Sequence, residues 1–130
     1  MRMRSPVVPV LLLAAAAQLP AQSWTTFYSA YEDGLAAQRQ GDPDLAVRAF
    51  SRAIALEPSP GNRVKTYGLN FLPAYHPYLR LAEAALASGD LARAEAALKE
   101  SARLGKEPPA EREALLARLK AAQPARPAPA

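Results

Sequence analysis

Apolar and small residues recur every three or four positions through most of this chain, the spacing that places them on one face of an α-helix. A clear stripe lies within residues 44–56 and comprises Ala46, Ala49, Phe50, Ala53 and Ile54. Comparable stripes predict helices over residues 24–40, 75–88, 90–103 and 109–122. The last helix carries Leu115, Leu116 and Leu119 on one side and charged residues elsewhere. The pattern predicts an all-α fold.

Short turn signals separate the helices into pairs. Gly41 suits the left-handed residue that follows a helix end, Asp42 suits an N-cap, and Pro43 suits the first helical position. Gly89 and Asp90 stand at the same place between the next two helices. Each pair is therefore predicted to be an antiparallel helical hairpin with a tight turn.

The second helical pair repeats the first at a fixed offset. Gly41 and Gly89 lie 48 residues apart, and the same offset relates Ala46 to Ala94 and Phe50 to Leu98. A repeated helical hairpin cannot bury its apolar face alone, so it stacks on its copy. This repetition predicts an α-solenoid, an architecture that favours binding over catalysis as the function.

The arrangement resembles the tetratricopeptide repeat (TPR), a helix-turn-helix unit of about 34 residues. That family keeps small residues, one large apolar residue and a proline at fixed positions of the unit. In this chain those positions fall on Gly34, Ala46, Phe50, Ala53 and Pro58 in the first unit, and on Ala82, Ala94 and Leu98 in the second. Departures are Asp33 at a usually apolar position, Ser101 at a usual alanine, and Ala37 and Ala85 at a common aromatic position. The resemblance implies repeats over about 27–60 and 75–108, with residues 109–122 as a capping helix.

Because the offset exceeds the family period, residues 61–74 are predicted to be a loop inserted between the repeats. The insertion contains Tyr67, Leu69, Phe71 and Leu72. Aromatic side chains are rarely left in water, so we expect these residues to fold back and fill a gap between the repeats. A loop that faces a partner is the alternative.

The resemblance also implies that the first helix of each repeat lines a concave groove. The family's groove positions fall on Tyr28, Tyr31, Leu35, Gln38 and Arg39, and on His76, Leu79 and Glu83. The Lys/Asn clamp of chaperone-binding members is replaced by Tyr31 and Leu35, so an extended or helical peptide suits this groove better than an isolated anion. Packing of Tyr28 and Tyr31 beneath a neighbouring helix or Trp24 is the alternative.

The two termini have distinct compositions. A basic stretch over residues 1–4, an apolar run over 7–17 and small residues before Gln18 predict a secretory signal peptide over residues 1–21. Cleavage before Gln18 or Gln22 would export the chain to the periplasm or the medium. The apolar run is too short to span a bilayer. Residues 124–130 form a Pro/Ala-rich tail.

Composition narrows the function further. The chain has no cysteine, which excludes disulfides and thiolate metal sites. Its net charge is +4, and positive and negative residues are interleaved along the helices. A nucleic-acid-binding protein would instead show a continuous stripe of positive residues. His76 is the single histidine and belongs to no recognisable catalytic or metal motif.

We therefore expect a non-enzymatic protein–protein interaction module that binds a peptide or protein segment after export. It is expected to use no cofactor, metal, nucleic acid or small-molecule substrate, and to meet the membrane only through its export signal. The alternative is an assembly subunit that forms a homodimer through the groove.

Overall fold

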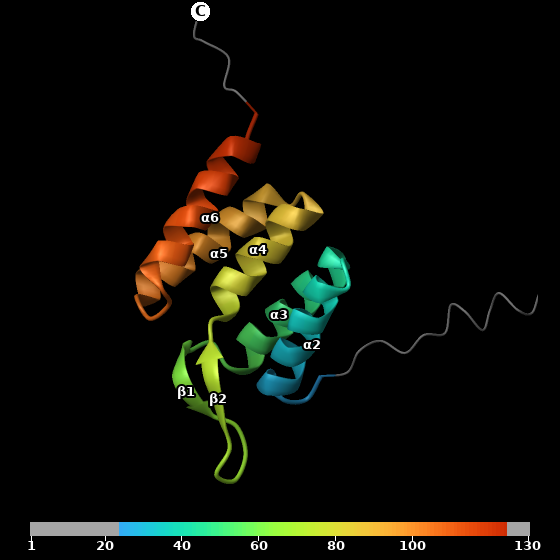
Figure 1. Ribbon diagram of the computed structural model, residues 1–130, viewed down its shortest axis with the longest axis vertical. Helices are drawn as coiled ribbons and strands as arrows, with labels where there is room; N and C mark the ends of the chain where they lie inside the picture. Colours follow the sequence, from blue (N-terminus) through green and yellow to red (C-terminus); the bar gives the residue numbers. More distant parts are fainter. Residues whose placement is uncertain (1–23, 125–130) are drawn as a thin grey trace, which may run out of the picture.

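In the described part of the chain, two helices are followed by a two-stranded sheet and then by three further helices (Figure 1). In this computed structural model, residues 24–124 are described. Their elements are α2 (Phe27–Arg39), α3 (Pro43–Leu56), β1 (Gly61–Lys65), β2 (Phe71–Tyr75), α4 (Pro77–Ser88), α5 (Leu91–Leu104) and α6 (Pro109–Ala122). The all-α prediction is correct for the helices but not for the inserted segment, which is a β-hairpin instead of a loop, so the fold is mainly helical. The predicted signal peptide and most of the tail lie outside the described residues.

The two tight turns between paired helices have the same backbone geometry. Gly41 and Gly89 have φ angles of 74° and 84°, in the left-handed region that glycine adopts without strain. The N–H groups of Asp42 and Asp90 each donate to the carbonyl oxygen five residues earlier, at 2.9 Å. Their carboxylates accept from the N–H three residues later, at 3.2 and 3.1 Å. The predicted left-handed glycines and aspartate N-caps are confirmed.

Each helix packs against the next one along the chain, and α4 also contacts α6. Small residues allow the close approach within the first pair. A Cβ added to Gly34 would lie 2.5 Å from the Phe50 ring, so only glycine fits there. Ala46 and Ala94 have no exposed surface. These positions therefore set how closely the paired helices approach.

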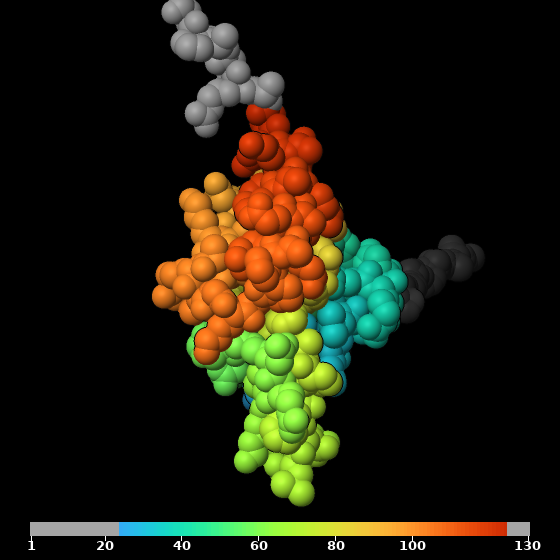
Figure 2. All heavy atoms as spheres, turned by 60° about the vertical axis from the view of Figure 1, so that its left-hand side comes forward, coloured from blue at the N-terminus to red at the C-terminus, as the bar shows by residue number. Residues whose placement is uncertain are grey.

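The hairpin formed by β1 and β2 projects beyond the helices at one end of the molecule (Figures 1 and 2). Val64 pairs with Leu72, and both are partly buried against the core. Lys65 pairs with Phe71 at the next position of the ladder, which points to the opposite face. The hairpin thus has one face toward the helices and one away from them.

The prediction that the insertion folds back is wrong for most of its apolar residues. Tyr67, Leu69 and Phe71 are 60%, 92% and 46% exposed. Only Leu72 packs against the core, because strand alternation and the projection of the hairpin carry the others away from it. The gap is filled instead by Tyr75, at the end of β2.

Tyr75 joins the hairpin to the helical core. It is fully buried, with its ring centroid 4.9 Å from that of Phe27 and 5.0 Å from that of Tyr31. Its hydroxyl lies 3.0 Å from the carbonyl oxygen of Ala53 and 2.8 Å from that of Glu57, at the end of α3. Burial, and then the charge of Glu57, raise the pKa of Tyr75. The phenol therefore stays protonated and can donate to those carbonyls.

The start of α4 is capped by a residue from a different segment. His76 occupies the N-cap position but makes no capping hydrogen bond with its side chain. Glu107, between α5 and α6, accepts from the N–H of Tyr78 at 3.0 Å and of Leu79 at 3.1 Å. Burial raises the pKa of Glu107, while hydrogen bonds from Ser101 and these two N–H groups oppose the shift. The carboxylate thus serves as a distant N-cap.

We predict that Ala46→Leu and Ala94→Leu each destabilise the fold by about 1–3 kcal/mol, because a larger side chain overpacks the contact between paired helices. Chemical denaturation measures this loss. Ala55→Leu, at an exposed position of α3, is the matched control and should be close to neutral. Near-neutral values for both buried alanines would contradict the close packing.

We predict that Glu107→Ala destabilises the fold by about 2–4 kcal/mol, because two buried N–H groups at the start of α4 lose their acceptor. Glu113→Ala removes an exposed carboxylate from α6 and should change stability by less than about 0.5 kcal/mol. Equal effects of the two substitutions in thermal melts would show that the distant cap contributes nothing.

Candidate functional site

Side chains from α2, α4 and α6 meet on one side of the molecule. The Gln38 amide donates to Glu83 Oε1 at 3.1 Å, joining α2 to α4. Arg80 donates to the same oxygen at 2.8 Å, and its other terminal nitrogen pairs with Glu111 of α6. We call this the three-helix face, defined by Gln38, Arg80, Glu83 and Glu111. Its bonds fix three helices side by side with hydrogen-bonding groups partly open to solvent.

The predicted groove residues divide into surface and core. Tyr28, Leu35, Gln38, His76 and Glu83 are half-buried, Arg39 is exposed, Tyr31 is 4% exposed and Leu79 has no exposed surface. Gln38 and Glu83 are brought into direct contact, as described above. The prediction that Tyr31 and Leu79 present their side chains to a partner is wrong.

Tyr31 is buried because the end of the inserted hairpin covers it. Its ring centroid lies 5.0 Å from Tyr75 and 5.6 Å from Phe50. Its hydroxyl accepts a hydrogen bond from the backbone N–H of His76 at 3.3 Å. The alternative that Tyr31 packs against neighbouring elements is therefore the correct one, and its contacts belong to the core.

His76 lies beside Glu111 and Arg80 of the three-helix face, which influence the pKa of its ring. Its side chain is half-buried, and burial lowers the pKa of the imidazole. The charge of Glu111 opposes this shift, and that of Arg80 adds to it. The ring is therefore neutral at neutral pH, when it offers one donor and one acceptor.

A cleft of about 380 Å³ separates the first half of α2 from the hairpin. Tyr28 and Tyr67 line it from the two sides, with ring centroids 5.6 Å apart. Asp33 also lines it and accepts a hydrogen bond from the Trp24 indole at 2.8 Å. This bond gives the exposed Asp33 carboxylate a partner at the surface of α2.

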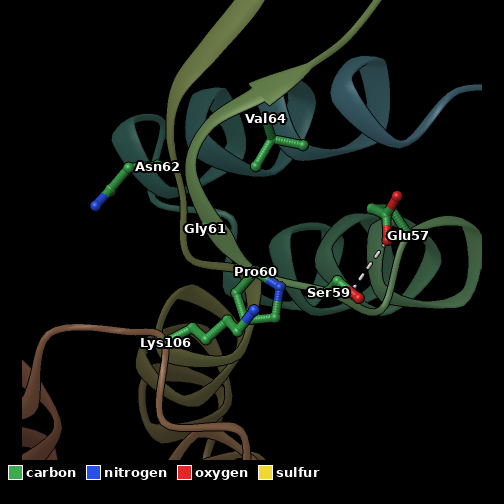
Figure 3. A pocket seen from close by; sticks show the side chains of 7 residues that line it. All are labelled: Glu57, Ser59, Pro60, Gly61, Asn62, Val64 and Lys106. Atoms are coloured by element: carbon green, nitrogen blue, oxygen red, sulfur yellow. Dashed lines mark hydrogen bonds between the residues drawn. The ribbon is translucent and has the colours of Figure 1, made fainter.

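A second pocket of about 570 Å³ lies beside the end of α3 and the start of β1 (Figure 3). Lys106 reaches toward Ser59 and Pro60, while Asn62 points away. The backbone N–H of Ser59 donates to Glu57 Oε2 at 3.1 Å, which engages the carboxylate locally. The pocket thus combines polar side chains with Pro60 and Val64.

Metal-binding groups and membrane-spanning helices can be assessed for residues 24–124. Within that range, no group of three or more His, Asp or Glu side chains could hold a metal ion. None of the helices in the described part of the chain combines the length and apolar character needed to cross a membrane.

We predict that Tyr31→Ala lowers the free energy of unfolding by about 3 kcal/mol or more, because it leaves a cavity among Phe50 and Tyr75. Tyr67→Ala removes a largely exposed ring and should cost less than about 1 kcal/mol. Thermal and denaturant unfolding of both variants test this ordering. A Tyr31→Ala variant as stable as the parent would contradict the core position of Tyr31 and favour its role on a binding surface.

Comparison of the chain with protein-family models, with curated proteins and with solved structures gives no match.

Proposed function

We propose that this chain is an exported TPR-like adaptor that binds a peptide or protein segment on its three-helix face. The observation that carries the proposal is the recurrence of one helical hairpin at an offset of 48 residues, down to the hydrogen bonds of its turn. Stacked helical hairpins form a short solenoid that places their first helices on a shared surface. A surface assembled from successive repeats is suited to an elongated ligand.

The chemistry of the three-helix face supports a peptide ligand. Gln38, Arg80, Glu83 and Glu111 provide both donors and acceptors, the two kinds of group that a peptide backbone requires. Arg39, next to Gln38 in the sequence, is exposed. An extended segment could hydrogen-bond to the polar groups and place an acidic group near this cation.

The export part of the proposal is supported by the N-terminal sequence. The basic start, the apolar run over residues 7–17 and the small residues that follow are typical of a cleaved signal peptide. The processed chain would then act in the periplasm or outside the cell. A partner is accordingly sought in that compartment.

Self-association is a second candidate, favoured by a different surface. Leu116 on α6 is 40% exposed and borders a cleft of about 500 Å³ with Glu95 and Lys120. A second copy could cover this leucine. In that case the chain would be an assembly subunit instead of an adaptor.

Site-specific photo-crosslinking in the native host tests the proposal. A photoreactive phenylalanine analogue replaces Gln38 or Glu111 on the three-helix face, or Ala55 on α3 as the exposed control. We expect both surface positions, and not the control, to give one adduct with another protein in the exported fraction. An adduct of twice the chain mass would favour self-association. Absence of adducts, or equal adducts at all three positions, would contradict the proposed surface.

A further inference from the structure

The proposed function leaves the hairpin tip without a role. We define the hairpin tip as Tyr67, Leu69 and Phe71, whose exposed fractions are 60%, 92% and 46%. Exposure is greatest at Leu69, near the apex, and the tip extends beyond all the helices (Figure 2). Contiguous exposed apolar side chains usually mark an interaction surface. Their position on a projection allows contact with a flat surface before any helix reaches it.

Basic side chains accompany the hairpin in the sequence. Residues 58–82 contain Arg63, Lys65 and Arg80 but neither Asp nor Glu. Arg63 lies over the Phe71 ring, with 4.8 Å between the guanidinium carbon and the ring centroid. Lys65 pairs with Phe71 in the ladder and is exposed. The apolar tip is therefore accompanied by two bases, Arg63 and Lys65, that favour an anionic surface.

Part of the backbone at the tip is already hydrogen-bonded within the turn. The N–H of Thr66 donates to the carbonyl oxygen of Asn70 at 3.0 Å, and the N–H of Asn70 donates to that of Tyr67 at 2.9 Å. The Asn70 side-chain amide adds a bond to the same Tyr67 oxygen at 3.2 Å. Backbone groups that are already paired cost less to remove from water.

We infer that the hairpin tip inserts into the interfacial region of a membrane that contains anionic phospholipid. Aromatic and aliphatic side chains partition into that region, and nearby lysine and arginine contact the phosphate groups. Glu32 and Asp33 of α2 line the same cleft as Tyr67 and Phe71, so these acids lie on the helix side of the tip. The protein would therefore bind through the apex at Leu69, with Arg63 and Lys65 near the phosphate groups and α2 away from the lipid.

This inference is independent of the proposed adaptor function, and lipid vesicles test it without any protein partner. The chain beginning at Gln22 retains every residue that the structure describes and lacks the apolar run of residues 7–17. It is mixed with vesicles of 30% phosphatidylglycerol in phosphatidylcholine, or of phosphatidylcholine alone, and bound protein is measured by flotation. Leu69→Ser and Lys65→Gln alter the hairpin, with Leu116→Ser and Lys120→Gln on α6 as matched controls.

We expect binding to the anionic vesicles, weakened about tenfold by Leu69→Ser and about fivefold by Lys65→Gln, with both controls unchanged. A Leu69→Trp variant should show an emission shift to shorter wavelength on vesicle addition that the parent, with Trp24 alone, does not show. Thermal melts should be unchanged for Leu69→Ser, because that side chain is almost fully exposed.

Failure of the parent chain to bind anionic vesicles would overturn the inference, as would equal losses in the hairpin and control variants. A tip that docks into a protein pocket is the competing outcome. It would appear as a protein adduct from a photoreactive residue at Leu69 in the native host, together with no emission shift on vesicles. Crosslinks at Gln38 and Glu111 on the three-helix face would remain informative in either case, so the two proposals fail separately.

Discussion

The buried carboxylate of Glu107 caps the start of α4, the helix against which α3, α5 and α6 pack. Helix α4 packs against α3, α5 and α6, yet it begins directly after the hairpin and has no capping side chain of its own. Glu107 provides that cap from a position 29 residues beyond Tyr78. A buried charge is tolerated only where hydrogen bonds replace its hydration, as the two N–H donors do here. The same bonds fix the path of the chain into α6, so the placement of α4 and of the last helix is coupled.

Those parts of the fold that depend on neighbouring residues could be predicted from the sequence. Gly41, Asp42 and Pro43 each determine one local conformation, so the turn could be predicted without knowledge of the rest of the chain. The spacing of Ala46 and Phe50 indicated which side of α3 would be buried. The repeat offset extended both conclusions to the second pair. Local geometry and repetition were sufficient for the helices and for the order in which they pack.

The hairpin and the burial of Tyr31 depend on contacts between distant segments, and the sequence did not reveal them. Strand pairing between β1 and β2 requires the chain to reverse around Gly68, whose φ angle is 57°. The turn-forming residues near that glycine were a usable signal, but Pro73 and the mixed polarity obscured the strands. Tyr31 appeared to face a groove because its cover, Tyr75, comes from the far end of the insertion. The candidate surface could therefore be predicted only for residues that no distant segment covers, such as Gln38 and Glu83.

The equal geometry of the two Gly-Asp turns has a consequence for how such a chain can be modified. The hairpin lengthens the connection between the helical pairs, yet each pair closes through the same hydrogen bonds. The inserted element is therefore a separable unit, held to the helices by Tyr75 at its exit and by the Val64–Leu72 pair, one step of the ladder before the turn-proximal Lys65–Phe71 pair. Exchanging the residues between those contacts would change the protruding surface and leave the helical frame as it is, which makes this connection a natural grafting position for protein engineering.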